Sequence, residues 1–260
     1  MTTLVTAAVL VSGVSGCEGN GVTTKAGTAR QLPSAPGSAA GSARERSGPG
    51  DCRKAKKKCV ALTFDDSPSP RTPQILDILR RYGVHATFFT LGKNHVARDP
   101  GTVRRMAAEG SEVETLTWSH QILTEISPAE VREEITRGRD AVARVIGRRP
   151  VLLRPPQGRT NPTVTAICRQ LGMAQILWSA SASDYQTTDS KLITSRILAQ
   201  TGPGGIILLH DRVDATNRGY NGTVAAIPGI ISTLKSRGYT FVTVTELLAP
   251  AKPRPGAVYR

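Results

Sequence analysis

The sequence predicts an α/β fold, a closed or nearly closed barrel of parallel strands with helices outside it, built as a single domain. Short apolar runs alternate with amphipathic segments along the chain, which is typical of parallel strands connected by helices. Polar residues repeatedly follow the ends of the apolar runs, and in a parallel barrel these ends lie on one face. The 260 residues are enough for one core of ordinary size.

Buried strands are expected at residues 60–64, 86–91, 151–153, 174–178, 206–209 and 239–244, with a short one before His120. Amphipathic segments predict helices at 73–82, 100–109, 128–146, 161–171, 189–200 and 225–237. Ser127, Pro128 and Glu130 give the third of these a start signal, with Ser127 as the cap. Six or seven strand–helix units favour a closed or nearly closed barrel, although spacing alone does not exclude an open sheet.

The two ends of the chain are expected to lie outside the barrel. The apolar run Leu4–Val14 is too short to cross a membrane, and V-S-G-C resembles a bacterial lipobox, so residues 1–17 are interpreted as a signal peptide. No Lys or Arg precedes this run. Lipidation of Cys17 would anchor an extracellular protein to the membrane. Residues 18–50 have the composition of a disordered linker, and residues 249–260 that of a flexible tail.

The chain is strongly basic, with 34 Lys and Arg against 20 Asp and Glu and a formal net charge of +14. Such a surface attracts polyanions, among them anionic wall polymers, unless it is simply a solvated, Arg-rich surface. The basic residues are scattered, and only residues 54–58 form a local run. Because no nucleic-acid motif accompanies them, no nucleic-acid partner is expected. Oligomeric state is unmarked in the sequence.

Of the four cysteines, Cys52 and Cys59 lie seven residues apart just before the first strand. In an extracellular protein this spacing favours a small disulfide loop over two free thiols or half of a metal site. Cys168 lies on an expected helix among apolar residues, which is typical of a buried, inert thiol.

Six polar residues lie at or shortly beyond strand ends: Asp65, Asp66, His120, Arg154, Asp184 and His210. Two adjacent carboxylates can divide the roles of metal ligand and general base, although Asp-Asp-Ser-Pro is also good turn sequence. Histidine suits metal binding or proton transfer, and an arginine can orient a carboxylate through two hydrogen bonds. Taken by itself, each of these residues is also compatible with a structural or surface role. Trp118, Trp178 and Tyr185 could line a sugar cleft or belong to the core.

The stretches that carry these residues resemble, in order, the five motifs of the NodB-homology polysaccharide deacetylases. VALTFDDSPSP resembles the first motif, TWSHQILTEIS the second, RPPQG the third, WSASASDY the fourth and IILLHD the fifth. The resemblance identifies residues 51–248 as a NodB-homology catalytic domain. It implies a distorted (β/α) barrel and a metal-dependent hydrolase that removes acetyl groups from polymers such as peptidoglycan, chitin or xylan, at carbon–nitrogen bonds other than peptide bonds when the acetyl is on nitrogen.

The resemblance also implies a role for each matching position. Asp65 matches the general base, Arg154 the arginine that orients it, and His210 the general acid, with Asp184 supporting it. Asp66 and His120 match ligands of a divalent metal, with zinc the first expectation and cobalt, nickel and manganese the others. Substrate contacts are expected at Gln157, whose backbone lies where the oxyanion is stabilised, and at Trp178 and Leu209, which would hold the acetyl methyl group.

One ligand position departs from the family's pattern. The second motif normally reads H-x-x-x-H, and Leu116 occupies the place of its first histidine. Leucine cannot bind a metal, and a catalytic zinc usually has three protein ligands. Ser67, Gln157, Ser181 and Tyr185 also differ from the usual Gly, Tyr, Asp and Trp of the motifs.

Three functions are therefore compatible with the sequence. The first is an active deacetylase whose metal site is weakened or completed by Glu114, a water or the substrate. In the second, the protein binds cell-wall glycan without turning it over. The third is a basic extracellular protein whose fold serves only to bind a partner. A wall-anchored, basic protein favours peptidoglycan or another wall polymer over dietary chitin or xylan.

Overall fold

The structure is a computed structural model, and it describes Cys52, residues 57–211 and residues 221–260. The expected signal peptide with its lipobox at Cys17 and the linker 18–50 lie outside the described residues. Within them, no helix is long and apolar enough to pass through a membrane.

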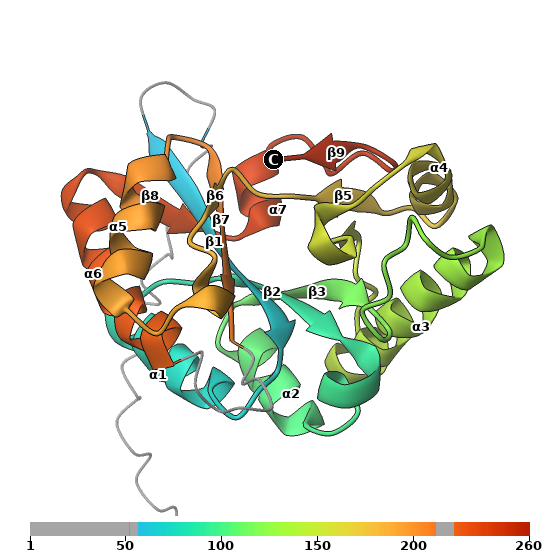
Figure 1. Cartoon of the computed structure of the whole chain (residues 1–260), viewed down its shortest axis with the longest axis horizontal. Coiled ribbons are helices and arrows are strands. Elements are labelled where there is room, and N and C mark those ends of the chain that lie inside the picture. Colours follow the sequence, from blue (N-terminus) through green and yellow to red (C-terminus); the bar gives the residue numbers. More distant parts are fainter. Residues whose placement is uncertain (1–51, 53–56, 212–220) are drawn as a thin grey trace, which may run out of the picture. The chain divides into compact units, whose positions relative to one another are not determined.

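A curled sheet of parallel strands forms the centre of the fold (Figure 1). The strand order is β6-β7-β1-β2-β3-β4-β5-β9, and β8 lies off this path, paired with the start of β1 on the edge opposite β7. The strands β5 and β6 lie towards opposite ends of this sheet, where β5 pairs with β4 and β6 pairs with β7. Only residues 177–179 separate them in the chain, so this short segment links the two ends of the curled sheet. The strands are β1 Lys58–Ser67, β2 Thr87–Leu91, β3 Glu112–Thr117, β4 Leu152–Leu153, β5 Ala174–Ile176, β6 Ala180–Ser181, β7 Gly205–His210, β8 Tyr239–Val242 and β9 Val258–Tyr259.

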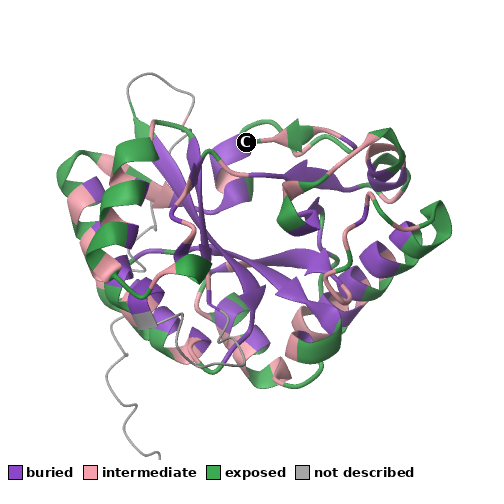
Figure 2. Cartoon of the chain, viewed as in Figure 1, coloured by how far each residue is buried: buried purple, intermediate pink, exposed green. Residues whose placement is uncertain are grey.

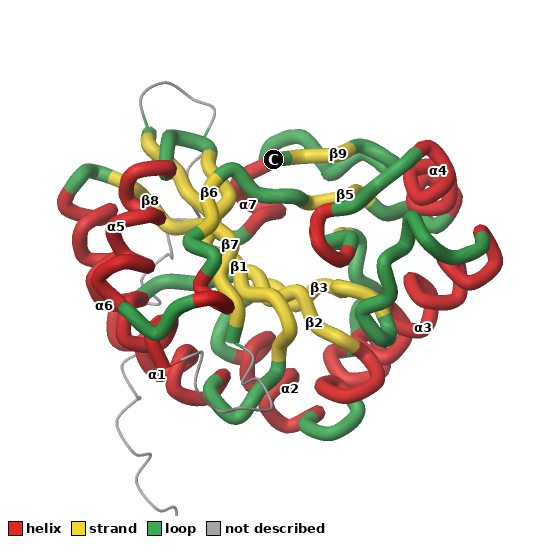
Figure 3. The backbone as a smooth tube through the Cα atoms, viewed as in Figure 1, coloured by secondary structure: helices red, strands yellow, loops and turns green. Residues whose placement is uncertain are grey.

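Helices cover the outside of this sheet (Figure 3). Several begin where the sequence supplies a cap: Asp99 caps α2, Asn161 caps α4 and Asp189 caps α5, while Ser127 and Glu130 form a complete capping box on α3. The helices are α1 Thr72–Tyr82, α2 Pro100–Ala108, α3 Pro128–Ile146, α4 Pro162–Gln170, α5 Ser190–Gln200, α6 Asn221–Ser236 and α7 Val244–Leu248, with short π and 3-10 turns at Gly92–Val96, Pro156–Gly158 and Asp184–Gln186.

The long strand β1 is buried on both faces (Figure 2). Val60, Leu62 and Phe64 pack outward against the helices, and Cys59 and Ala61 point into the barrel. Two-sided burial explains why the sequence reads as a continuous apolar run here rather than as an alternating one. The expected fold class, a parallel (β/α) barrel of distorted form, is confirmed.

The C-terminal residues differ from expectation. A flexible tail was expected from residue 249, but Val258 and Tyr259 pair with Gln175 and Ile176 and extend the sheet as β9. The expected strand 239–244 also ends early, at Val242, because Thr243 caps α7 in a second capping box with Glu246.

The cysteines lie as the sequence predicted. Cys52 and Cys59 form a disulfide with a Cα–Cα distance of 5.7 Å, which fixes the start of β1. Cys168 is buried in the cluster beneath α3 and α4, and its burial raises the thiol pKa to about 12. At neutral pH it is therefore neither a nucleophile nor a metal ligand.

Candidate active site

The site begins with an irregularity at the end of β1. Successive residues of a regular strand point to opposite faces, so Asp65 and Asp66 would normally diverge. The register of β1 against β2 shifts between Asp65 and Ser67, and Asp66 has a φ of 64°. This bulge turns both carboxylates into one cavity, as bulges commonly do near active sites.

The cavity has a volume of about 430 Å³ and opens at the carboxyl ends of the strands. Its lining contains six of the expected site residues: Asp65, Asp66, His120, Gln157, Trp178 and His210. Ser181, Tyr185 and Leu208 complete it. Leu209 was expected in the wall, and that expectation is wrong. Because side chains alternate along β7, Leu208 lines the cavity while Leu209 packs outward among the helices.

Arg154 fixes the position of the Asp65 carboxylate. The guanidinium Nη1 lies 2.7 Å from Asp65 Oδ1 and also donates to Thr63 Oγ1, while Nε and Nη2 donate to the carbonyls of Ile176 and Leu177. The arginine side chain is fully buried and lies 4.1 Å over the ring of Phe89. Burial raises the pKa of Asp65, and the charges of Arg154 and His210 oppose that rise without cancelling it. Asp65 is thus a fixed carboxylate with enhanced proton affinity.

Asp184 holds His210 on the opposite side of the cavity. Asp184 Oδ1 lies 2.8 Å from His210 Nδ1, and Oδ2 accepts hydrogen bonds from the His210 amide and from Thr223 Oγ1. Burial alone would lower the pKa of His210, but the hydrogen bond and charge of Asp184 outweigh it and raise the pKa to about 9. The imidazole is therefore protonated at neutral pH and can donate from Nε2.

Aromatic rings and the 3-10 turn after β4 form the mouth of the cavity. Tyr185 meets the His210 ring edge-on at 5.4 Å and is half exposed. Gln157 has a φ of 57°, and the next residue must be small, because a Cβ on Gly158 would lie 2.9 Å from Trp178. Trp178 and Tyr185 thus present exposed ring surface of the kind that carbohydrates stack on.

Asp66 and His120 face each other across a gap. Their Oδ1 and Nε2 atoms are 3.8 Å apart, and Asp66 Oδ1 is buried without a hydrogen-bond partner. His120, like Asp66, has a positive φ, 70°. A buried, unsatisfied carboxylate oxygen beside an imidazole on a strained backbone fits the two donors that would hold a divalent cation.

The third donor of such a site is missing. Leu116 is 1% exposed and packs in the barrel interior with Phe89, Leu91 and Leu152. In the part of the chain that the structure describes, no group of three His, Cys, Asp or Glu residues could hold a metal ion. The site is therefore one donor short of the three usual for catalytic zinc.

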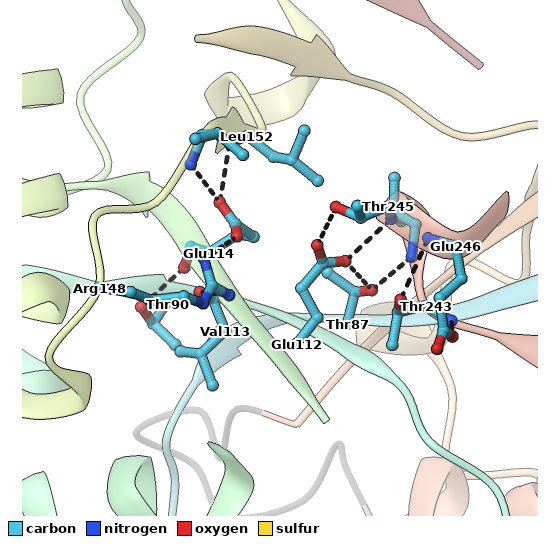
Figure 4. Close-up of polar contacts among 12 residues, drawn as sticks. Thr87, Thr90, Glu112, Val113, Glu114, Arg148, Leu152, Thr243, Thr245 and Glu246 are labelled. Atoms are coloured by element: carbon cyan, nitrogen blue, oxygen red, sulfur yellow. Dashed lines mark hydrogen bonds and ion pairs between the residues drawn. The ribbon is translucent and has the colours of Figure 1, made fainter. Parts of the chain in front are cut away.

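Glu114 does not replace the missing ligand, so that hypothesis is wrong. It lies two residues before Leu116 on the same face of β3, about 7 Å further down the barrel. Its carboxylate accepts hydrogen bonds from Arg148 at 2.7 Å and from the amides of Val151 and Leu152 at 2.8 Å (Figure 4). These bonds tie β3 to the segment that begins β4, and both carboxylate oxygens are used.

Two supporting carboxylates were not found from the sequence. Glu134 on α3 accepts hydrogen bonds from the amide of Ser119 at 2.8 Å and from its hydroxyl at 2.7 Å, next to His120. Asp211 follows His210, accepts a hydrogen bond from Thr72 at the start of α1, and has its pKa raised to about 7 by burial. Glu134 falls in no motif, Asp211 is the last residue of the fifth, and only their folded contacts reveal their supporting role.

These features define a class of protein. A parallel (β/α) barrel has one cavity at the carboxyl ends of its strands. The cavity contains the oriented carboxylate of Asp65, the protonated His210 held by Asp184, and the pair of Asp66 and His120. Together they form the acid–base machinery of a barrel hydrolase.

Comparison with known proteins gives the family. The family model described as polysaccharide deacetylase matches residues 53–176. A peptidoglycan N-acetylglucosamine deacetylase of Bacillus cereus is 35% identical over 195 residues, which cover 74% of this chain and 89% of that protein. The chain belongs to the polysaccharide deacetylase family. The peptidoglycan N-acetylmuramic acid deacetylase PdaC of Bacillus subtilis is 39% identical over 76% of this chain, and this chain covers only 40% of that protein.

Solved structures support the same relationship. A structure described as T48 deacetylase with substrate superimposes with a TM-score of 0.73 and 34% identity, covering 81% of this chain and 99% of the other. A family 4 acetyl xylan esterase from Clostridium thermocellum in complex with cobalt has a TM-score of 0.71 and 33% identity, covering 78% and 98%. A mutant of a pseudoenzyme of the same family, with restored activity, has a TM-score of 0.68 and 27% identity, covering 74% and 68%.

Proposed function

We propose that this protein is a metal-dependent hydrolase that removes acetyl groups from an N-acetylglucosamine polymer. The observation that carries the proposal is the presence of two preassembled pairs in one cavity. Asp65 with Arg154 and His210 with Asp184 are each joined by a contact of 2.7 to 2.8 Å. Decay of an unused site would be expected to break at least one of these pairs, since each buries charged groups at a cost.

The residues divide the reaction between them. Asp65, held by Arg154, takes a proton from the attacking water, and its raised pKa makes it a stronger base than a surface carboxylate. His210 donates a proton from Nε2 to the leaving amine. The backbone N–H of Gln157 is assigned to the developing oxyanion. A divalent cation on Asp66 and His120, zinc or otherwise cobalt, nickel or manganese, would polarise the acetyl carbonyl and acidify water. Trp178 and Leu208 would enclose the methyl group.

The proposed substrate is peptidoglycan, with chitin as another N-acetylglucosamine polymer and xylan, which is not one, as the less favoured alternative. Two relatives that are each 39% identical to this chain bear names that refer to peptidoglycan. We also place the protein outside the cell, secreted to the wall or anchored by lipid on Cys17. The Cys52–Cys59 disulfide supports that location, because structural disulfides persist in oxidising compartments.

Acetate release tests the proposal. The full chain is incubated with N-acetylglucosamine oligomers and with whole peptidoglycan, with and without added zinc or cobalt. Metal-dependent release is expected from the wild type and not from Asp65→Asn, whose amide cannot accept the proton. A folded wild type that releases no acetate from any polymer with any of these metals contradicts the proposal.

Leu116 favours a second candidate, a protein that binds cell-wall glycan without turnover. The residue replaces a ligand with an apolar side chain that is well packed in the core. Under this function, N-acetylglucosamine oligomers bind with equal affinity to the wild type and to Asp65→Asn, and acetate never appears. Titration calorimetry beside the acetate assay separates the two functions.

A further inference from the structure

A cluster of cations without acidic partners lies where β1 begins, at the end of the barrel opposite the cavity (Figure 1). Lys57 and Lys58 lead into β1, and Lys235 and Arg237 lie at the end of α6, just before β8. Because β8 pairs with the start of β1, with Lys58 opposite Tyr239, these segments lie side by side. The four cationic residues are all exposed, and we call them the amino-face patch.

Backbone carbonyls, rather than carboxylates, hold the cationic groups of the patch. Lys58 Nζ donates to the carbonyl oxygen of Arg237 at 3.2 Å, and Arg237 Nη1 donates to that of Leu198 at 3.1 Å. Lys235 Nζ donates to the carbonyl oxygen of Tyr82 at the end of α1. Within the described residues, no carboxylate forms an ion pair with any member of the patch. Positive charges that are gathered without a counter-charge attract anions from solution.

Helix geometry alone does not explain the patch. The negative end of the α6 dipole favours the two cations at the end of that helix, but not the two that precede a strand. At the end of α2, by contrast, Arg105 is neutralised by Asp77 at 2.6 Å and by Glu109 at 2.7 Å. The sequence also extends the charge, because the six residues between the bonded cysteines read R-K-A-K-K-K, with five cations and no acid. The first four of these lie outside the described residues, and the patch is defined without them.

We propose that the amino-face patch binds a cell-wall polymer whose backbone is built of phosphodiesters. Ammonium and guanidinium groups form charge-assisted hydrogen bonds with phosphate oxygens, and a chain with one negative charge per repeat contacts several cations at once. None of the large apolar side chains exposed on the described residues belongs to the patch, so it has no group to insert into a lipid surface. The choice of a wall polymer rests on the proposed extracellular location, whereas the patch itself does not.

The patch is separate from the cavity. Lys58 and Asp65 lie seven residues apart on β1, which is about 23 Å along the strand. A polymer on the patch therefore leaves the cavity open, and the protein can hold the polymer and a neighbouring glycan at the same time. Binding at the patch raises the concentration of the protein on the wall, so it lowers the apparent KM for whole walls and leaves kcat unchanged.

Two variants of equal net charge test the proposal. Fluorescence anisotropy measures the binding of a labelled poly(glycerol phosphate) chain to the full-length protein. The patch variant combines Lys57→Gln, Lys58→Gln, Lys235→Gln and Arg237→Gln. The control variant replaces four exposed cations elsewhere that have no ion pair within the described residues, by Arg104→Gln, Arg132→Gln, Arg144→Gln and Lys191→Gln. The patch variant is expected to bind about tenfold or more weakly and with a shallower dependence on salt, because it releases fewer counterions, whereas the control changes less than about twofold.

A third variant separates charge from local structure. Lys57→Arg, Lys58→Arg and Lys235→Arg together keep every positive charge, and this protein is expected to bind the polymer as the wild type does. Circular dichroism and thermal melts establish that each variant is folded. Acetate release from neutral N-acetylglucosamine oligomers is expected to be the same in all of them, because the patch is remote from the cavity.

Three results overturn the proposal. Equal weakening in the patch and control variants means that net charge alone attracts the polymer. Unchanged binding in the folded patch variant places the polymer elsewhere. Tighter binding to vesicles of anionic lipid than to the polymer, lost in the patch variant, assigns the patch to a membrane surface. The polymer assay involves no turnover, so a protein that releases no acetate still passes or fails it independently.

Discussion

The side chain of Leu116 is similar in volume to that of a histidine, but it has no polar atom that needs a hydrogen-bond or metal partner. It fills the barrel interior beside Phe89 and Leu152 without a polar atom to satisfy. A histidine in this position would bury two ring nitrogens, and only a bound cation and a hydrogen-bond acceptor would satisfy both. The leucine therefore removes a dependence of folding on metal at the same time as it removes a ligand.

Leu116→His should reverse both effects. We expect the affinity for Mn²⁺ or Zn²⁺ to rise by about tenfold or more and metal-dependent acetate release to increase. In the presence of a chelator the variant should melt at a lower temperature than the wild type, and metal should raise its Tm. Thermal melts with and without metal, beside the acetate assay, measure this. If neither metal affinity nor activity changes, the site is misshapen beyond this one position.

Asp184→Asn tests the origin of the proton on His210. The carboxylate raises the imidazole pKa to about 9, so the protonated acid persists across neutral pH. The asparagine should move the alkaline limb of the activity profile down, towards the ordinary histidine pKa of about 6.5. Thr223→Val, which removes only one hydrogen bond to Asp184, is the matched control and should shift the limb less.

The same pair contributes to stability in a definite pH window. Because the folded pKa of His210 lies above its unfolded value, the stabilisation is fully present below pH 6.5 and is lost as pH rises through about 9. The Tm difference between wild type and Asp184→Asn should therefore be largest in acid and shrink above pH 9. An unchanged difference across that range would mean that Asp184 does not set the histidine's charge.

For individual residues, the motifs and the strand ends predicted most of the cavity residues. They could not predict contacts between segments that are distant in the sequence. Asp65, His120 and His210 could be predicted to meet because parallel strands end on one face. The resemblance pointed to Leu209, and the sequence could not show that Leu208 faces the cavity instead, because a fully buried apolar strand has no polar–apolar alternation. Glu134 gave no signal, since one glutamate of a charged helix resembles its neighbours until the helix is docked.

At the scale of elements, the docking of α3 on β3 positions the loop that carries Ser119 and His120. The contact is close at Gly138, where a Cβ would lie 2.4 Å from the carbonyl carbon of Thr117. This close approach brings Glu134, one turn earlier on α3, to the amide and hydroxyl of Ser119. The loop that carries His120 is therefore fixed by the helix that follows it in the chain.

Glu134→Gln should loosen that loop without unfolding the barrel. The glutamine amide has one oxygen and can no longer accept hydrogen bonds from the Ser119 amide and hydroxyl on separate oxygens. We therefore expect the Mn²⁺ affinity, measured in the presence of an N-acetylglucosamine hexamer, to fall several-fold, with a small change in Tm. Glu133→Gln is the control, since Glu133 pairs only with Arg137 on the surface. Glu134→Asp should recover part of the affinity. Equal Mn²⁺ affinity in Glu134→Gln and Glu133→Gln would rule out a positioning role.

Glu114 has a different task, because it fastens β3 to β4 where the two strands share little backbone pairing. The paired register is limited to Thr115 with Leu153, and Glu114 adds bonds to two amides and Arg148. Glu114→Ala should lower the free energy of unfolding by about 2 to 3 kcal/mol, because it leaves the buried amide of Leu152 and the partly buried amide of Val151 without an acceptor. Urea unfolding measures this. Mn²⁺ affinity of the folded variant should not change, and a specific loss of metal binding would contradict the structural role.

The elements that the sequence predicted are those with length and periodicity. The helix at 128–146 was recognisable from its capping box and the strand at 60–64 from its apolar run, and both are present. The strands β6 and β9 have two residues each, too short to show any period. They form because a neighbouring strand edge is available, which is a property of the assembled sheet and not of their own sequence.

For the whole molecule, the charge of +14 acts at longer range than any contact in the cavity. Inside the site, charges are locally compensated, as in Asp65 with Arg154 and Asp184 with His210. Among the described Lys and Arg residues only Arg139 and Arg154 are buried, so the others would be available to attract an anionic wall polymer. Surface attraction and site chemistry should consequently respond differently to salt.

Raising the salt concentration from about 50 to 500 mM shortens the Debye length from about 14 to about 4 Å and should separate these two contributions. Adsorption of the full chain to walls that carry phosphate-rich polymers should fall steeply with salt. Acetate release from neutral N-acetylglucosamine oligomers should change little, because the groups that react are buried and paired. Sedimentation with intact walls and with walls stripped of anionic polymer measures the first, and the acetate assay the second. Adsorption that is equal on both walls and insensitive to salt would mean that the basic surface only solvates the protein.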